Sequence, residues 1–99
     1  MASDEWLVYM IQASDKSLYT GITTDMERRW LQHRGGTGGA RYFRGRKPEK
    51  LVYVEPADDR SHASQREAAI KKLHRRAKLV LIDSAQNCLG DYAYLDLET

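Results

Sequence analysis

Cysteine and proline are scarce in this chain of 99 residues, and long apolar runs are absent. The single cysteine, Cys88, excludes an intramolecular disulfide, which is typical of proteins from a reducing compartment. No apolar run approaches the roughly 20 residues that span a bilayer. Asp4 and Glu5 stand where an export signal would carry basic residues. We therefore expect a cytoplasmic protein with no membrane contact and a size typical of one domain.

Several common chemical motifs are also missing. The sequence contains no CxxC pair, no HExxH, no GxGxxG and no Walker glycine–lysine loop. Their absence excludes the usual zinc and nucleotide sites. Cys88 lies in a segment without clear periodicity, so we expect an inert thiol rather than a nucleophile. Tyrosine, arginine, histidine and glutamate remain as the residues that could carry out chemistry.

Positive charge is concentrated in the middle of the chain, although the net charge is only +2. Residues 28–50 contain eight Arg or Lys and one Glu, a net +7, whereas residues 1–27 and 83–99 each carry −4. A cationic block between acidic ends indicates an anion-binding surface. An ordinary solvated face is the alternative. The stretch ARYFRGRK, residues 40–47, favours the first interpretation because cations alternate with aromatics, as in phosphate contacts combined with stacking.

The pattern of apolar residues predicts three strands, at residues 6–12, 18–23 and 51–55, with Pro56 ending the third. The first two are close enough to form an antiparallel hairpin. Thr24 and Glu27 form a predicted capping box that starts a helix ending near Arg34. Further helices are expected at about 61–75 and from about residue 77. We predict an α+β domain over residues 1–86, with a three-stranded antiparallel sheet flanked by helices, and an acidic tail over residues 87–99.

Two tyrosines lie in the predicted hairpin. A turn centred near Ser14 would place Tyr9 opposite Tyr19 on the same face of the sheet, and a slip of one residue would reverse one of them. Gly21 shares the face of Tyr19, and a glycine in a strand often marks the close approach of a ligand or another backbone. Ordinary core packing is the alternative for the two tyrosines.

The stretch WLVYMIQASDKSLYTGITTDMERRWLQH, residues 6–33, resembles the start of a GIY-YIG nuclease domain. The two triplets that define the family correspond to residues 7–9 and 19–21. Both tyrosines and the second glycine are kept, whereas Leu7, Val8 and Thr20 depart from the pattern.

Matches further along the chain strengthen the resemblance. The family has an arginine in the next helix, a histidine one turn later and a metal-binding glutamate in a later helix, which correspond to Arg29, His33 and Glu67. The resemblance covers about residues 6–83. It is strongest to the small stand-alone bacterial members, the YhbQ-like type, which carry an RGRxP segment, here residues 44–48.

This resemblance implies metal-dependent hydrolysis of nucleic-acid phosphodiester bonds. Glu67 would hold Mg²⁺ or Mn²⁺, with substrate oxygens and waters as the remaining ligands, and Arg29 would present a permanent forked charge to the phosphate. One tyrosine would orient or deprotonate the attacking water, supported by His33, and the sequence leaves open which tyrosine. The expected catalytic residues are Tyr9, Tyr19, Arg29, His33 and Glu67, and the expected nucleic-acid contacts are Gly21, Arg41, Arg44, Arg46, Lys47, Lys71 and Lys72.

The expected partner is nucleic acid, with DNA favoured over RNA, in DNA repair, recombination or processing. A catalytically weak or inactive nucleic-acid-binding module on the same scaffold is the main alternative, since we identify no separate DNA-binding domain. An accessory protein that contacts a partner through its acidic tail is a third. Single residues have ordinary alternatives too: Glu67 could simply pair with Lys71 one turn later.

Overall fold

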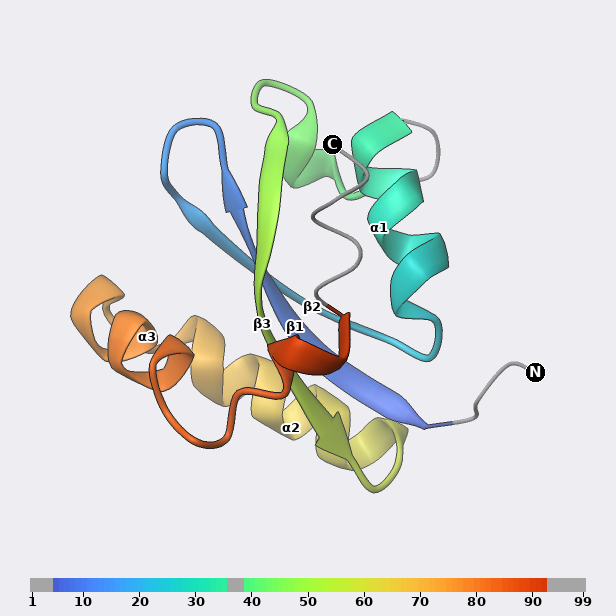
Figure 1. Ribbon diagram of the computed structural model, residues 1–99, viewed down its shortest axis with the longest axis vertical. Helices are drawn as coiled ribbons and strands as arrows, with labels where there is room; N and C mark the ends of the chain where they lie inside the picture. Colours follow the sequence, from blue (N-terminus) through green and yellow to red (C-terminus); the bar gives the residue numbers. More distant parts are fainter. Residues whose placement is uncertain (1–4, 36–38, 93–99) are drawn as a thin grey trace.

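The computed structural model describes residues 5–35 and 39–92 and contains a three-stranded antiparallel sheet in the order β2-β1-β3 (Figure 1). Strand β1 spans Trp6–Ala13, β2 spans Leu18–Thr23 and β3 spans Pro48–Ala57. The helices are α1 (Met26–Gly35), the short 3-10 helix η1 (Arg41–Phe43), α2 (Arg60–Lys71) and α3 (Arg75–Ile82). The predicted α+β class is confirmed. None of the described helices has the length and apolarity needed to cross a membrane.

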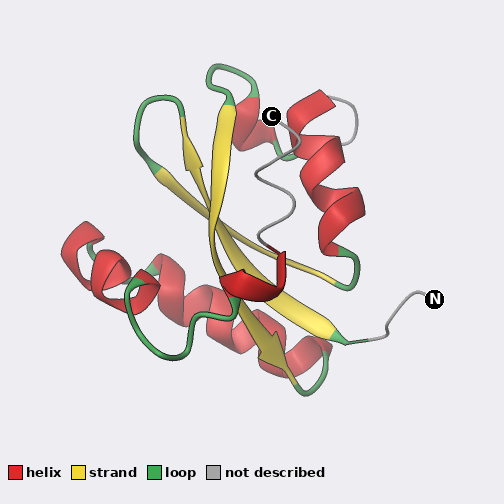
Figure 2. Cartoon of the chain, viewed as in Figure 1, coloured by secondary structure: helices red, strands yellow, loops and turns green. Residues whose placement is uncertain are grey.

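The central strand β1 separates two apolar cores. Alternate side chains of a strand point to opposite faces, and here Tyr9 packs with Trp30 of α1, whereas Met10 packs with Ile70 of α2. The two helices therefore cover opposite faces of the sheet. In Figure 2 the strands pass in front of α2, and α1 lies beside them. Trp30 and Ile70 are at most 1% exposed, and burying an aliphatic or aromatic side chain of this kind contributes about 1.5–3 kcal/mol.

The β1–β2 turn does not lie at the position predicted from the sequence. Ala13 N donates to Ser17 O at 2.9 Å, Lys16 N donates to Ala13 O at 2.8 Å, and Lys16 has a left-handed φ of 72°. Ser17 N also donates to the Asp15 carboxylate at 3.0 Å. The turn is therefore centred on residue 15, one position later than predicted.

This shift changes the partners of both hairpin tyrosines. Tyr9 lies opposite Gly21, and Tyr19 lies opposite Ile11. The prediction that the tyrosines face each other directly is wrong by two residues. Because an even shift preserves the alternation of side chains, both tyrosines still project from the same face.

Strand β3 does not end at Pro56, contrary to prediction. It runs from Pro48 to Ala57, and Pro56 lies opposite Leu7. Because β3 is an edge strand, the missing N–H of Pro56 removes no hydrogen bond to another strand. The prediction overlooked that proline is compatible with an edge.

Two helix boundaries also differ from prediction. Helix α1 begins at Met26, and the Asp25 carboxylate accepts from Arg28 N at 3.1 Å, so Asp25 rather than Thr24 caps it. The predicted helix over residues 61–75 ends at Lys71, because His74 caps α3 by accepting from Ala77 N. Three adjacent capping residues (Thr23, Thr24 and Asp25) made the first boundary ambiguous.

The first part of the predicted acidic tail is ordered against β3. The Asn87 side chain accepts from Val54 N at 3.1 Å and donates to Val52 O at 2.9 Å and to Ile82 O at 2.8 Å. Cys88 N donates to Val54 O at 2.7 Å. Leu89 and Tyr92 pack against the core cluster that contains Tyr9. Residues 93–99 lie outside the described part of the chain.

A partly buried ion pair fixes α2 on β3. The Arg66 guanidinium donates two hydrogen bonds to Glu55, at 2.6 and 2.9 Å, and Tyr53 Oη donates to the same carboxylate. Burial raises the pKa of the Glu55 carboxyl, but the hydrogen bonds from Arg66 and Tyr53 outweigh it and hold this pKa below its ordinary value. The forked contact also restricts rotation of α2 about its axis.

We expect Arg66→Ala to lower the free energy of unfolding by about 2–3 kcal/mol at pH 7, because it removes both charged hydrogen bonds from a buried carboxylate. The lowered pKa of Glu55 contributes stability above its unfolded value of about 4.3, and this contribution disappears as the pH falls. The penalty should therefore shrink at pH 3. Urea unfolding at both pH values is the measurement. Arg76→Ala, at an exposed position on α3, is the control, and equal losses for the two variants would contradict the prediction.

Candidate active site

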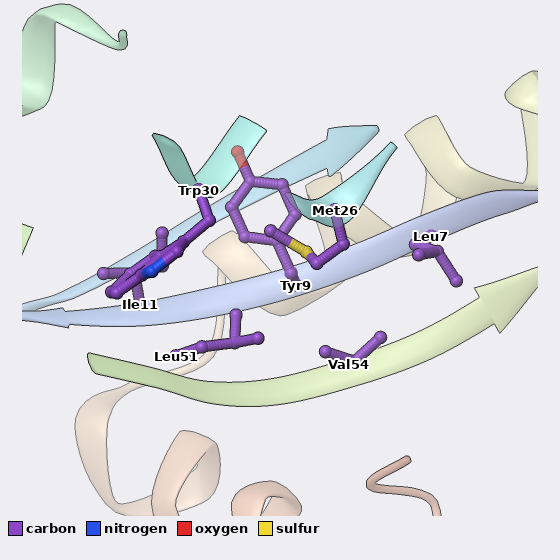
Figure 3. Close-up of a cluster of buried hydrophobic side chains, with 7 residues drawn as sticks. All are labelled: Leu7, Tyr9, Ile11, Met26, Trp30, Leu51 and Val54. Atoms are coloured by element: carbon purple, nitrogen blue, oxygen red, sulfur yellow. The ribbon is translucent and has the colours of Figure 1, made fainter. Parts of the chain in front are cut away.

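Tyr9 and His33 join β1 to α1 through a buried hydrogen bond. The Tyr9 side chain is 0% exposed and rises from β1 toward α1, beside Met26 and Trp30 (Figure 3). Its Oη lies 2.8 Å from His33 Nε2. His33 reaches this position because Met26, Trp30 and His33 form the buried stripe of α1, with the spacing of residues that share a helix face.

The hydrogen-bond partners of His33 define its protonation. Ala40 N donates to His33 Nδ1 at 3.2 Å, so Nδ1 is an acceptor and the proton of the neutral ring lies on Nε2. Burial, reinforced by the charge of Arg29, lowers the pKa of His33 to about 4. The imidazole is therefore neutral at pH 7 and donates its Nε2 proton to Tyr9 Oη.

Arg29 is coupled to both members of this pair. Burial and the neighbouring Tyr19 raise the pKa of the Tyr9 hydroxyl well above its ordinary value, whereas Arg29 opposes the rise. Arg29 Nη1 donates to Gln32 Oε1 at 2.9 Å along the same helix. Arg29 is partly buried, whereas the neighbouring Arg28 is exposed.

Gly21 makes room for the Tyr9 ring. A Cβ atom at position 21 would lie 2.6 Å from Tyr9 Oη, 2.8 Å from Tyr9 Cζ and 3.1 Å from Tyr19 Cε2. The close approach expected at this glycine is thus made by a side chain of the protein itself. Gly21 is buried, so the structure gives it a packing role under Tyr9.

Five rings form what we call the aromatic cluster, namely Tyr9, Tyr19, His33, Tyr42 and Phe43. Tyr19 is central, with ring centroids 5.4 Å from His33 and 5.2 Å from each of Tyr42 and Phe43. The last two come from η1 and were not predicted as site residues. Their only signal in the sequence was the alternation of aromatics with arginines.

The basic loop that follows η1 lies against this cluster. The Arg46 guanidinium stacks over the Tyr42 ring at 4.3 Å, within the range of a cation–π contact, and pairs with Asp15 at 3.3 Å. Three other predicted phosphate contacts, Arg41, Arg44 and Lys47, are exposed. The cluster therefore has an aromatic wall and a cationic rim.

Glu67 lies on α2, which packs on the face of the sheet opposite to that of Tyr9. Its carboxylate pairs with Lys71 Nζ at 3.3 Å and its side chain is 24% exposed. Ala63 and Ile70 are the buried residues of α2. Viewed down the helix axis, Arg66 and Glu67 are about 100° apart and lie on opposite sides of these two residues. Because Arg66 reaches Glu55 on β3, Glu67 lies on the flank of α2 that is turned away from β3.

Glu67 is not part of a preformed metal site in the described part of the chain. Within residues 5–35 and 39–92, no three His, Cys, Asp or Glu side chains gather closely enough to hold a metal. A lone, partly exposed carboxylate is compatible with Mg²⁺, which keeps several waters and is often completed by substrate phosphate. The structure brings together four of the five predicted catalytic residues, Tyr9, Tyr19, Arg29 and His33, and leaves Glu67 paired with Lys71.

Comparison with known proteins agrees with the resemblance seen in the sequence. Residues 5–79 match the GIY-YIG catalytic domain family. A UPF0213 protein of Desulfotalea psychrophila is 48% identical over 82% of this chain and 74% of its own length. The UPF0213 protein YhbQ of Escherichia coli is 46% identical over 78% of this chain and 76% of its own length. The solution NMR structure of a UPF0213 protein from Bacillus halodurans is 38% identical, covers 83% of this chain and 86% of that chain, and superposes with a TM-score of 0.53.

We expect Gly21→Ala to destabilise the protein by about 1–3 kcal/mol, because overpacking of this size forces side chains from their positions. Tyr9 Oη is the atom nearest to the added methyl group, so Tyr9→Phe should reduce the penalty in a double-mutant cycle. Gly45→Ala is the matched control, since nothing lies within 4 Å of its Cβ position. Chemical denaturation gives the free energy of unfolding of each variant: Gly21→Ala, Tyr9→Phe, the double variant and Gly45→Ala. A Gly21 penalty that is no larger than that of Gly45 would contradict the close packing.

We also expect His33 to make the stability of the protein depend on pH. The pKa of His33 in the folded protein is about 4, below the ordinary value of about 6.5, so the unfolded chain binds more protons between these values. Stability should therefore fall as the pH is lowered from about 6.5 to 4. His33→Gln should remove about 2–3 kcal/mol of this pH dependence. Urea midpoints at pH 7 and pH 4 test this, and parallel curves for wild type and His33→Gln would disprove it.

Proposed function

Because this chain belongs to the GIY-YIG family, we propose that it is a metal-dependent nuclease that hydrolyses phosphodiester bonds in nucleic acid, with DNA the favoured substrate. The observation that carries this proposal is the convergence of Tyr9, Tyr19, Arg29 and His33, from β1, β2 and α1, beside a cationic loop. We propose DNA repair, recombination or processing as the setting of this activity.

Each residue has a role that its surroundings support. Hydrolysis requires a water placed in line with the leaving oxygen and a positive charge at the phosphate. Arg29 supplies a permanent charge that also opposes the rise in the pKa of Tyr9. The tyrosine pair orients or deprotonates the water. His33 donates to Tyr9 Oη, and a donor at this oxygen favours the phenolate form.

Glu67 is the residue we assign to hold Mg²⁺ or Mn²⁺. The chemistry that such an ion supplies when bound is Lewis-acid stabilisation of negative charge on the phosphate. Lys71 keeps the carboxylate paired in the structure and is released for phosphate contact when that pair opens. The exposed cations Arg41, Arg44, Lys47 and Lys72, together with Arg46, would bind the backbone on either side of the scissile phosphate.

A nucleic-acid-binding module with little or no turnover is the second candidate. It is favoured by the Glu67–Lys71 pair at 3.3 Å and by the position of α2 on the face of the sheet opposite to that of Tyr9. Both candidates predict binding, and only the first predicts turnover that depends on a divalent ion.

We expect Arg29→Ala and Glu67→Ala each to reduce the cleavage rate at saturating substrate about 10²–10³-fold, as is typical when one group that stabilises the transition state is removed. The exposed Arg28→Ala is the matched control and should retain wild-type turnover. Branched, single-stranded and nicked DNA and RNA, incubated with Mg²⁺ or Mn²⁺, are the substrates. If wild-type protein cleaves none of them faster than the two variants, the nuclease proposal fails. Retained binding would then favour the second candidate.

A further inference from the structure

A second basic segment lies at the junction of α2 and α3. The sequence KKLHRRAK, residues 71–78, carries five Lys or Arg and one His without any acidic residue. Its charged side chains are exposed except that of Lys78, which is partly buried. We call this segment the α2–α3 corner. Like charges gathered in this way repel one another, and an anion bound at the surface relieves that repulsion.

The protein itself neutralises little of this charge. Lys71 pairs with Glu67 at 3.3 Å. Arg75 Nη1 donates to Lys16 O at 2.6 Å, which is a neutral carbonyl. Among the residues that the structure describes, no carboxylate lies within ion-pair distance of Lys72, Arg76 or Lys78. The corner therefore presents positive charge to whatever approaches it.

The turn between β1 and β2 connects this corner to the basic loop of the candidate active site. On one side, Ser14 N donates to Lys47 O at 2.8 Å and Lys47 N donates to Ser14 Oγ at 3.0 Å. On the other side, Arg75 reaches Lys16 O. Two segments about thirty residues apart in the sequence thus lie against the same short turn.

The acidic groups at this turn are already paired. Arg46 lies 3.3 Å from the Asp15 carboxylate, and Lys16 lies 3.0 Å from that of Glu49. The pKa of the Asp15 carboxyl is lowered, chiefly by its hydrogen bonds with Ser17, and that of Glu49 is lowered by hydrogen bonds from Lys16 and Gln12. These two carboxylates interrupt the positive surface less than unpaired carboxylates would.

We propose that loop 44–47, the β1–β2 turn and the α2–α3 corner form one phosphate-binding track, which carries the nucleic-acid backbone from the aromatic cluster to the start of α3. This inference rests on the proposed function, since it takes nucleic acid as the ligand at the cluster. Continuity with that site selects a nucleic-acid backbone over an anionic lipid or an acidic protein. A substrate must then extend past the scissile phosphate to bind tightly.

The test measures binding of a fluorescent 30-base-pair DNA duplex by anisotropy, in EDTA so that no cleavage intervenes, from 50 to 300 mM KCl. Each phosphate contact contributes about 0.9 to the slope of log K against log salt. Removing two cations without described partners, Lys72→Gln with Arg76→Gln, should reduce the slope by about 1.8 and weaken binding at 50 mM KCl at least tenfold. Circular dichroism would confirm that both exposed changes leave the fold intact.

The matched control removes two cations at the opposite end of the sheet, Arg28→Gln with Arg60→Gln. Arg28 lies in the first turn of α1, and the Arg60 guanidinium lies 5.8 Å from the Trp6 ring at the start of β1. This variant should keep the wild-type slope. Equal slopes for the two double variants would overturn the track, as would binding to phosphatidylserine vesicles or polyglutamate that exceeds binding to DNA.

The outcome is separable from that of the nuclease proposal. A reduced slope together with no cleavage by wild-type protein would support the track and refute the nuclease. Cleavage with an unchanged slope in Lys72→Gln/Arg76→Gln would support the nuclease and refute the track. If both hold, this variant should raise KM for long substrates.

Discussion

The contact between the Tyr9 ring and Gly21 is the constraint on which the candidate site depends. With only a hydrogen at position 21, the ring lies against β2 and its Oη reaches His33 Nε2 at 2.8 Å. A methyl group there would meet the oxygen at 2.6 Å and push it away. One glycine thereby lets three elements, β1, β2 and α1, meet at a single hydroxyl. Tyr19 then packs beside that hydroxyl, and η1 covers Tyr19 with Tyr42 and Phe43.

The two faces of a three-stranded sheet impose a second constraint. Tyr9 and Met10 are adjacent in the sequence, so their side chains point to opposite faces, toward α1 and α2 respectively. A residue of α2 can approach the Tyr9 face only around an edge of the sheet. The forked Arg66–Glu55 contact turns Arg66 toward β3 and thus turns Glu67 the other way. The ion pair that holds α2 in place therefore also sets the direction of the proposed metal ligand.

Much of this arrangement follows from local sequence patterns, and the remainder depends on tertiary contacts. The strands predicted at 6–12 and 18–23 and the buried stripe of α1 were predictable because strand alternation and helical spacing are visible in consecutive residues. The hairpin register was not, since it depends on the left-handed conformation of Lys16 in the turn and lysine gives no signal for that conformation. The Asn87 side chain forms hydrogen bonds with the backbone of Val52, Val54 and Ile82. No local sequence pattern predicts contacts between residues so far apart in the chain. Tyr42 and Phe43 were read correctly as aromatics among cations, but only the fold shows that they enclose Tyr19.

The electrostatics of the site place a clear demand on catalysis. Burial raises the pKa of the Tyr9 hydroxyl and lowers that of His33, so in the free protein both groups are neutral and share one hydrogen bond. Tyr9 can act as a base only if more positive charge approaches its oxygen. Arg29 already supplies part of it, since it lowers the pKa of both groups, and the neutral His33 keeps its Nε2 proton directed at the phenol. A further cation close to this hydroxyl would have to supply the rest.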